Sequence, residues 1–184
     1  VAITSIVLTG GVSGTTFNWT RNYTGTVTGI AASGSGDISG VLTNSTTSPV
    51  TVTFTITPTA NGCNGSPIYA TVLVNPTPDA VATPASQTKC SGVAITTIVL
   101  SGNVGSTTFN WTRDNTVAVT GIANSGAGNI SGVLTNTTNA PVTVTFTITP
   151  TANGCSGQVI YATVLVNPTP NAVAIQASQT KCSG

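Results

Sequence analysis

Apolar and polar residues alternate with a period of two along a stretch that occurs twice without a change, from Pro49 to Cys63 and from Pro141 to Cys155. This alternation is typical of a β-strand with one buried face. The other face carries only threonine, which suits a pleated surface and offers water a hydroxyl. An apolar, uncharged strand aggregates when it is left unpaired, so we expect this one to lie inside a sheet, closed by its flanking prolines. The residues predicted to face the core are Val50, Val52, Phe54 and Ile56.

Other segments of the first 78 residues also alternate, more weakly. They predict strands at 1–8, 15–21, 27–30, 38–42 and 68–74, and a flexible connection at 33–36. Phe17 and Trp19 are two residues apart, so their side chains lie on the same face of a strand, and we expect both rings in the core. No segment has helical periodicity. Short strands with frequent turn signals predict an all-β chain of immunoglobulin-like sandwiches, each of about seven strands.

The whole chain is a repeat. Residue 93 aligns with residue 1, an offset of 92, and most positions are then identical. Asn75–Pro78 and Pro84 predict a stiff connector between two domains. We therefore expect a repeat at 1–78 that lacks its opening segment, a complete repeat at 79–170, and the opening segment of a next repeat at 171–184. Because Lys181–Gly184 matches Lys89–Gly92, we expect both ends to be cuts in a longer protein.

Charge is scarce along this chain. Only 4% of its residues are charged, against roughly 25% in an average soluble domain. Since 39% are hydrophobic, the composition favours a folded chain over a disordered one. A net charge of +1 gives no positively charged surface that would attract nucleic acid or anionic lipid. No apolar run approaches the roughly 20 residues that span a bilayer. We expect no nucleic-acid partner and no membrane insertion.

Four cysteines, two in each repeat, predict disulfides and an oxidising, extracellular location. A zinc site is disfavoured because the chain has no histidine and no closely spaced cysteine pair. We favour a Cys90–Cys155 bridge within one domain, with Cys63 and Cys182 pairing with neighbouring repeats. The alternative pairs Cys63 with Cys90 and Cys155 with Cys182, which would join neighbouring domains.

No acidic position recurs at the 92-residue offset. Paired-carboxylate hydrolysis, a Ser-His-Asp triad and a calcium cage all need groups that the chain does not supply. We expect no enzyme activity, no cofactor and no catalytic or metal site. The acids and their counterparts are Asp37 and Asn129, Asp79 and Asn171, and Asp114 and Asn22.

Several larger side chains do recur. Arg21 and Arg113 share a face with the neighbouring tryptophans, so we expect them to cap the rim of the core. Trp19 and Trp111 are expected in the core, not stacked on a sugar. A candidate lateral or interdomain contact surface lies on the opposite face of the last predicted strand; its residues are Tyr69, Leu73, Tyr161 and Leu165.

The motifs Phe-Asn-Trp-Thr-Arg, Val-Thr-Val-Thr-Phe-Thr-Ile-Thr-Pro, Asn-Gly-Cys, Val-Asn-Pro-Thr-Pro and Lys-Cys-Ser-Gly resemble those of PKD-like, immunoglobulin-like repeats. Such repeats occur in very large secreted surface proteins of Bacteroidota, including gliding-motility and adhesin-type proteins. The resemblance covers essentially the whole chain. It implies a structural repeat of an extracellular fibre or surface stalk, whose partners are neighbouring copies of the repeat.

A glycan- or surface-binding adhesive module is the alternative function. Two routes of assembly are open. We favour one very long covalent chain; in the other route residues 171–184 complete the sandwich of a separate molecule, by donor-strand assembly.

Overall fold

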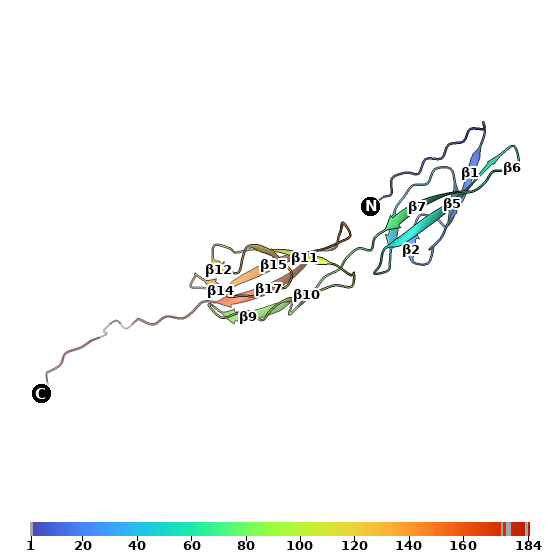
Figure 1. Cartoon of the computed structure of the whole chain (residues 1–184). Helices are drawn as coiled ribbons and strands as arrows, with labels where there is room; N and C mark the ends of the chain where they lie inside the picture. The colour runs from blue at the N-terminus through green and yellow to red at the C-terminus, as the bar shows by residue number, and fades with distance from the viewer. Residues whose placement is uncertain (1, 174, 176–177, 183) are drawn as a thin grey trace. The chain divides into compact units, whose positions relative to one another are not determined.

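The computed structural model describes residues 2–173, 175, 178–182 and 184. Strands are the only regular elements among these residues (Figure 1), which confirms the all-β prediction. No helix there is long and apolar enough to cross a membrane. The chain separates into two compact units. Unit 1 consists of Val1–Ala80, Ser101–Phe109 and Thr149–Val159, and unit 2 of Val81–Leu100, Asn110–Ile148 and Ile160–Gly184.

The first repeat is built around the threonine-faced strand, β5, which pairs with β1 on one side and with β7 on the other. Val52, Phe54 and Ile56 are fully buried, as the period-two pattern predicts, and Val50 is partly buried against the same core. β3 extends the sheet beyond β1, β6 forms a short hairpin with β5, and β2 pairs with β4 in a second, smaller sheet. The strands are β1 Thr16–Arg21, β2 Val27–Gly29, β3 Ser33–Ser35, β4 Leu42–Asn44, β5 Val50–Ala60, β6 Cys63–Asn64 and β7 Ile68–Val74.

The second repeat has the same plan with additional strands. Its main sheet has the order β13-β11-β15-β17-β9, so that the threonine-faced strand β15 is again central. Two-stranded sheets form between β8 and β10 and between β12 and β14. The strands are β8 Val81–Thr83, β9 Ser86–Cys90, β10 Val99–Ser101, β11 Thr108–Arg113, β12 Val119–Gly121, β13 Ser125–Ala127, β14 Leu134–Asn136, β15 Val142–Ala152, β16 Cys155–Ser156 and β17 Ile160–Asn167.

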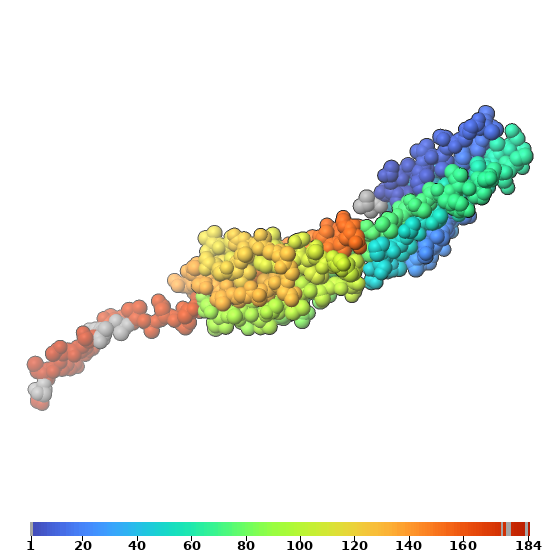
Figure 2. Space-filling view, in the orientation of Figure 1, coloured from blue at the N-terminus to red at the C-terminus, as the bar shows by residue number. Residues whose placement is uncertain are grey.

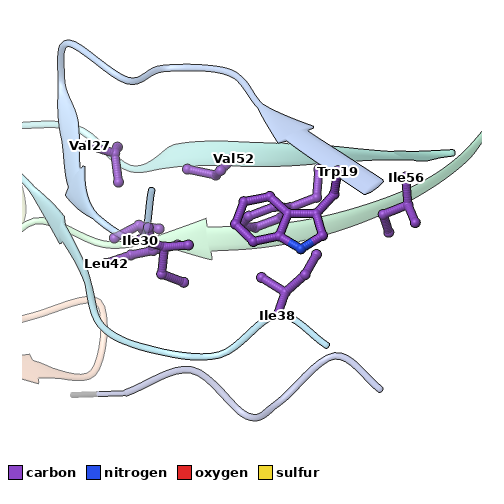
Figure 3. Close-up of a cluster of buried hydrophobic side chains, with 9 residues drawn as sticks. Trp19, Val27, Ile30, Ile38, Leu42, Val52 and Ile56 are labelled. Carbon is purple, nitrogen blue, oxygen red and sulfur yellow. The ribbon is translucent and has the colours of Figure 1, made fainter. Parts of the chain in front are cut away.

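The core of the first repeat is organised around Trp19 (Figure 3). Its ring meets Phe54 edge to face, with 5.7 Å between centroids, a favoured geometry for aromatic pairs. Trp19 lies opposite Gly34 in the β1–β3 ladder. A Cβ at position 34 would collide with the indole, so glycine is what lets the ring lie across β3. The other side chains of this cluster are Val27, Ile30, Ile38, Leu42, Val52, Ile56 and Val74.

The structure corrects three expectations from the sequence. Residues 33–35 form β3 instead of a flexible connection, because Gly34 packs against the indole. Pro58 does not close β5, which continues to Ala60 while Pro58 pairs with Phe17. The described part of 1–8 forms only the isolated bridges Ala2↔Val41 and Ile6↔Ile38, not a strand.

Candidate functional site

The outer edge of the second repeat is covered by its opening segment. β9 runs parallel to β17, with Ser86 opposite Thr163 and Cys90 opposite Asn167. Backbone hydrogen bonds hold both ends: the N–H of Thr163 donates to the carbonyl of Ala85 at 2.9 Å, and the N–H of Ser91 donates to that of Asn167 at 2.8 Å. β17 is therefore paired on both sides, with β15 and with β9.

The corresponding edge of the first repeat is open. β7 has the same sequence as the first seven residues of β17, yet among the described strands it pairs with β5 alone. Ala162 and Val164 of β17 are both 0% exposed, whereas their counterparts Ala70 and Val72 in β7 are only half-buried. Because the two sequences are identical, the difference in burial comes from the missing neighbouring strand.

A groove lies at this open edge. It is lined by Ala2, Ile3, Thr4, Leu42, Val72 and Val74, among other residues of unit 1. In the space-filling view the N-terminal residues (blue) lie beside β7 (green) on the surface of the first repeat (Figure 2). The groove occupies the place that β9 fills in the second repeat.

A side-chain contact also fixes β9. The Nε2 of Gln87 donates to the carbonyl of Thr96 at 2.9 Å, and the N–H of Thr96 donates to Oε1 of Gln87 at 2.8 Å. The Nζ of Lys89 donates to Oγ1 of Thr96 at 3.1 Å. Sequence reasoning missed this pairing, although a signal for it exists: Gln87 and Thr96 recur at the repeat offset as Gln179 and Thr4.

The four cysteines are free thiols in the structure. Cys90 lies opposite Asn167, just beyond the Val142↔Val166 pair, whereas Cys155 lies opposite Ala152. The full 11-residue length of β15 separates these two levels, which is roughly 33 Å at the usual rise of a strand. A disulfide needs Cα atoms within about 7 Å. The intradomain Cys90–Cys155 bridge that we favoured from the sequence is therefore incompatible with this register.

The predicted contact surface is solvent-accessible. Tyr69 and Tyr161 are 69% and 62% exposed, and Leu73 is 61% exposed; Leu165 is half-buried. Tyr69 lies opposite Thr55 on β5, so the ring borders the threonine face. A role in lateral contacts stays a prediction.

Both tryptophans belong to the core. Trp19 and Trp111 are 7% and 8% exposed, and their Nε1 atoms donate to the carbonyls of Gly36 and Gly128, each at 3.1 Å. Neither ring face is available to stack on a sugar.

Arg113 is buried beside this core. Its Nε donates to the carbonyl of Ile122 at 2.8 Å, and its Nη1 donates to that of Val119 at 2.9 Å. Burial lowers the pKa of Arg113 below its ordinary value, whereas the charge of Asp114 acts in the opposite direction. The guanidinium thus ties together backbone carbonyls of β12 and of the residue that follows it.

Two of the three acids, Asp37 and Asp114, have structural roles that asparagine fulfils equally well. Oδ1 of Asp37 accepts from the N–H of Leu8 at 2.8 Å, and Oδ1 of Asn129 accepts from that of Leu100 at 2.9 Å. Each position therefore supplies an oxygen acceptor, and the charge is incidental. The described residues contain no group of three or more His, Cys, Asp and Glu side chains that could hold a metal ion. Asp114 and Asn22 are the second pair of positions at which an acid and an asparagine play the same acceptor role. They accept from the N–H groups of Thr145 and Thr53 at 2.7 and 2.8 Å.

Comparison with known proteins identifies a family for both repeats. The sequence profile of the PKD-like domain matches residues 4–78 and 87–170. No curated protein sequence matches the chain. Two solved structures resemble it over 85% of its length. One is Dpr11 IG1 bound to DIP-gamma IG+IG2, with 7% sequence identity, a TM-score of 0.33 and 84% of that chain covered. The other is zebrafish RET cadherin-like domains 1 to 4, with 9% sequence identity, a TM-score of 0.32 and 42% of that chain covered. Neither likeness is close enough to indicate a function.

Proposed function

Because the chain belongs to the PKD-like domain family, we propose that it is a structural repeat of an extracellular fibre or surface stalk. One observation carries this proposal: the tryptophans, Arg113 and the acid or asparagine positions that correspond between the repeats are used inside the fold. The tryptophans are buried, the Arg113 guanidinium holds backbone carbonyls in and next to β12, and two acids exchange with asparagine in the same acceptor role. No acid recurs between the repeats and the chain has no histidine, which favours a non-enzymatic role.

The surface fits such a role. A chain with 4% charged residues has few like charges that would repel one another when many copies are held close together. Its threonine-rich strand faces keep it soluble through hydroxyls, whose hydration changes little with pH or ionic strength. The chain's cysteines suit an oxidising compartment outside the cell.

The second candidate is an adhesive module that binds glycans or a surface. The exposed rings of Tyr69 and Tyr161 favour it, because aromatic side chains are enriched at binding surfaces. Burial of both tryptophans counts against it. Bacteroidota surface proteins of the adhesin or gliding-motility type, which the motifs resemble, accommodate either role.

Electron cryomicroscopy of the native material tests the proposal. We expect filaments in which PKD-like sandwiches repeat along the axis. Native material that consists of dispersed single molecules would contradict a fibre. A Tyr69→Ala, Tyr161→Ala double variant that abolishes glycan or surface binding while filaments persist would favour the adhesive alternative.

A further inference from the structure

The outer face of the main sheet carries polar side chains that the fold does not use. We propose that this face is, in each repeat, a binding site for an uncharged oligosaccharide. The proposal deepens the adhesive alternative, to which it gives a site and a ligand class, and it does not rest on the fibre function. In the second repeat the sheet edge beside the site is covered by β9, so the site does not depend on the open edge of the first repeat.

The side chains of this face form rows across the strands of the first repeat. Residues that lie directly opposite each other on neighbouring strands point to the same side of a sheet. One row therefore crosses β7, β5, β1 and β3. It spans three strand spacings, which is about 14 Å and longer than a single sugar ring. This first row is Tyr69, Thr55, Thr20 and Ser33, and a second row beside it is Thr57, Asn18 and Ser35.

The hydroxyl and amide groups of the two rows line a shallow depression of about 420 Å³. The structure shows no hydrogen bond from these side chains to any residue that it describes. Other asparagines of the repeat are used by the fold: Oδ1 of Asn22 accepts from the N–H of Thr53 at 2.8 Å, and Nδ2 of Asn44 donates to the carbonyl of Val74 at 2.8 Å. The polar groups of the depression therefore remain able to donate to and accept from a ligand.

The chemistry of this face fits a neutral sugar. Serine, threonine and asparagine side chains both donate and accept hydrogen bonds, which matches the hydroxyl groups of a sugar. The ring of Tyr69 is 69% exposed beside Thr55, and it offers an apolar surface to the C–H face of a pyranose. Neither row contains a charged side chain, so the depression has no group to pair with a carboxylate, sulfate or phosphate.

A second copy of the chain fits this face less well. Serine is depleted at protein–protein interfaces, and serine and threonine are under-represented among the residues that contribute most to binding there. Hydroxyl groups make up most of both rows. The observations therefore favour an oligosaccharide over a protein partner.

The second repeat keeps the arrangement. Tyr161 is 62% exposed and lies opposite Thr147, and β17, β15, β11 and β13 are neighbours in the same order. One position of the rows differs, because Ala127 stands where the first repeat has Ser35. We therefore expect a site in both repeats, and weaker binding at the second. The other counterparts are Asn110, Thr112, Ser125 and Thr149.

An NMR titration of the full chain tests the site residue by residue. The probes are hexasaccharides of glucose, of mannose and of N-acetylglucosamine, with hexagalacturonate as the anionic comparison. We expect a neutral probe to shift the backbone amides of Thr20, Ser33 and Thr55 and of their counterparts, with no effect of added salt. Hexagalacturonate should shift none of them. Absence of shifts with all three neutral probes, or equal binding of hexagalacturonate, would overturn the proposal.

Each repeat is a control for the other in the variants. Tyr69→Ala should weaken binding at the first repeat about tenfold through loss of the ring contact, and should leave the second repeat unchanged. Tyr69→Phe should retain binding, because it keeps the ring. Thr55→Val removes one hydroxyl and should weaken binding about fivefold. Thr51→Val is the matched control, since Thr51 lies on the same face of β5 outside both rows.

Binding at the first repeat that survives Tyr69→Ala, or that falls as far with Thr51→Val as with Thr55→Val, would contradict the site. Sedimentation of the unliganded chain separates sugar binding from packing between copies. Oligomers that dissociate in the Tyr69→Ala, Tyr161→Ala variant, with no oligosaccharide bound by the original chain, would overturn the proposal in favour of a second copy. Native filaments without oligosaccharide binding would refute the site alone, and oligosaccharide binding without filaments would refute the fibre function alone.

Discussion

A matched pair of substitutions measures what the missing strand contributes. Val164 and Val72 occupy the same position of the same sequence, but Val164 is 0% exposed and Val72 is only half-buried. Replacing Val164 with alanine removes two carbon groups, which costs about 1.6 kcal/mol in transfer free energy. A residual cavity of about 50 Å³ would add up to ~1.2 kcal/mol. We therefore expect the free energy of unfolding of the second repeat to fall by about 2 kcal/mol.

Val72→Ala should destabilise the first repeat by less than about 1 kcal/mol, because its side chain borders an open groove that leaves no enclosed cavity. The chain has two tryptophans, one in the core of each repeat. Fluorotryptophan labelling thus gives one ¹⁹F resonance per repeat, and urea or thermal unfolding can be followed for each repeat separately. A loss of about 2 kcal/mol lowers the Tm of a domain of this size by roughly 8–16 °C. Equal losses in the two repeats would refute the conclusion that the β7 edge is open.

Three further predictions concern single positions. Gly126→Val should lower the stability of the second repeat by at least ~2 kcal/mol, because the new side chain meets the Trp111 indole; an unchanged urea midpoint would contradict this packing. Asp114→Asn should leave the urea midpoint unchanged while Asp114→Ala lowers stability by about 1 kcal/mol, since the backbone N–H of Thr145 needs an oxygen acceptor and not a charge. The urea midpoint should not move between about pH 5 and 8, because no histidine titrates there. Because burial lowers the pKa of Arg113, its guanidinium loses a proton at a lower pH in the folded state than in the unfolded state. The free energy of unfolding therefore gains from this group only as the pH becomes strongly alkaline.

Strand identity was predictable where burial is one-sided. β5 and β7 match their predicted ranges at the N-terminal end because period-two alternation reports a strand with one covered face. β3 escaped prediction because its sequence, Ser-Gly-Ser, has no apolar pattern. It is a strand only because Gly34 lets the indole of Trp19 lie against its backbone, and this is a tertiary cause that local propensity does not contain.

The roles of the acids and cysteines could also be predicted from the sequence only in part. That no acid recurs was visible in the sequence, but the shared acceptor role of Asp37 and Asn129 required their hydrogen bonds. The favoured Cys90–Cys155 pair does not fit the register, because connectivity depends on strand direction. β9 runs parallel to β17, which carries Cys90 to the opposite end of the sheet from Cys155. Spacing along the chain gives no information on that direction.

The two repeats act as controls for each other. The sequence of β10, Val99–Ser101, is a strand only where β8 pairs with it. Its counterpart at 7–9 forms no strand, and there Val7 is 66% exposed against 48% for Val99. One missing segment therefore accounts for differences at two separate places, the β7 edge and residues 7–9. If the lack of that segment is the cause, a synthetic peptide of residues 79–92, which carries β8 and β9, should reverse both: residues 7–9 should gain amide protection from hydrogen exchange, and the cost of Val72→Ala should rise towards that of Val164→Ala. Protection at only one of the two places would mean that the peptide binds without restoring the fold of a complete repeat.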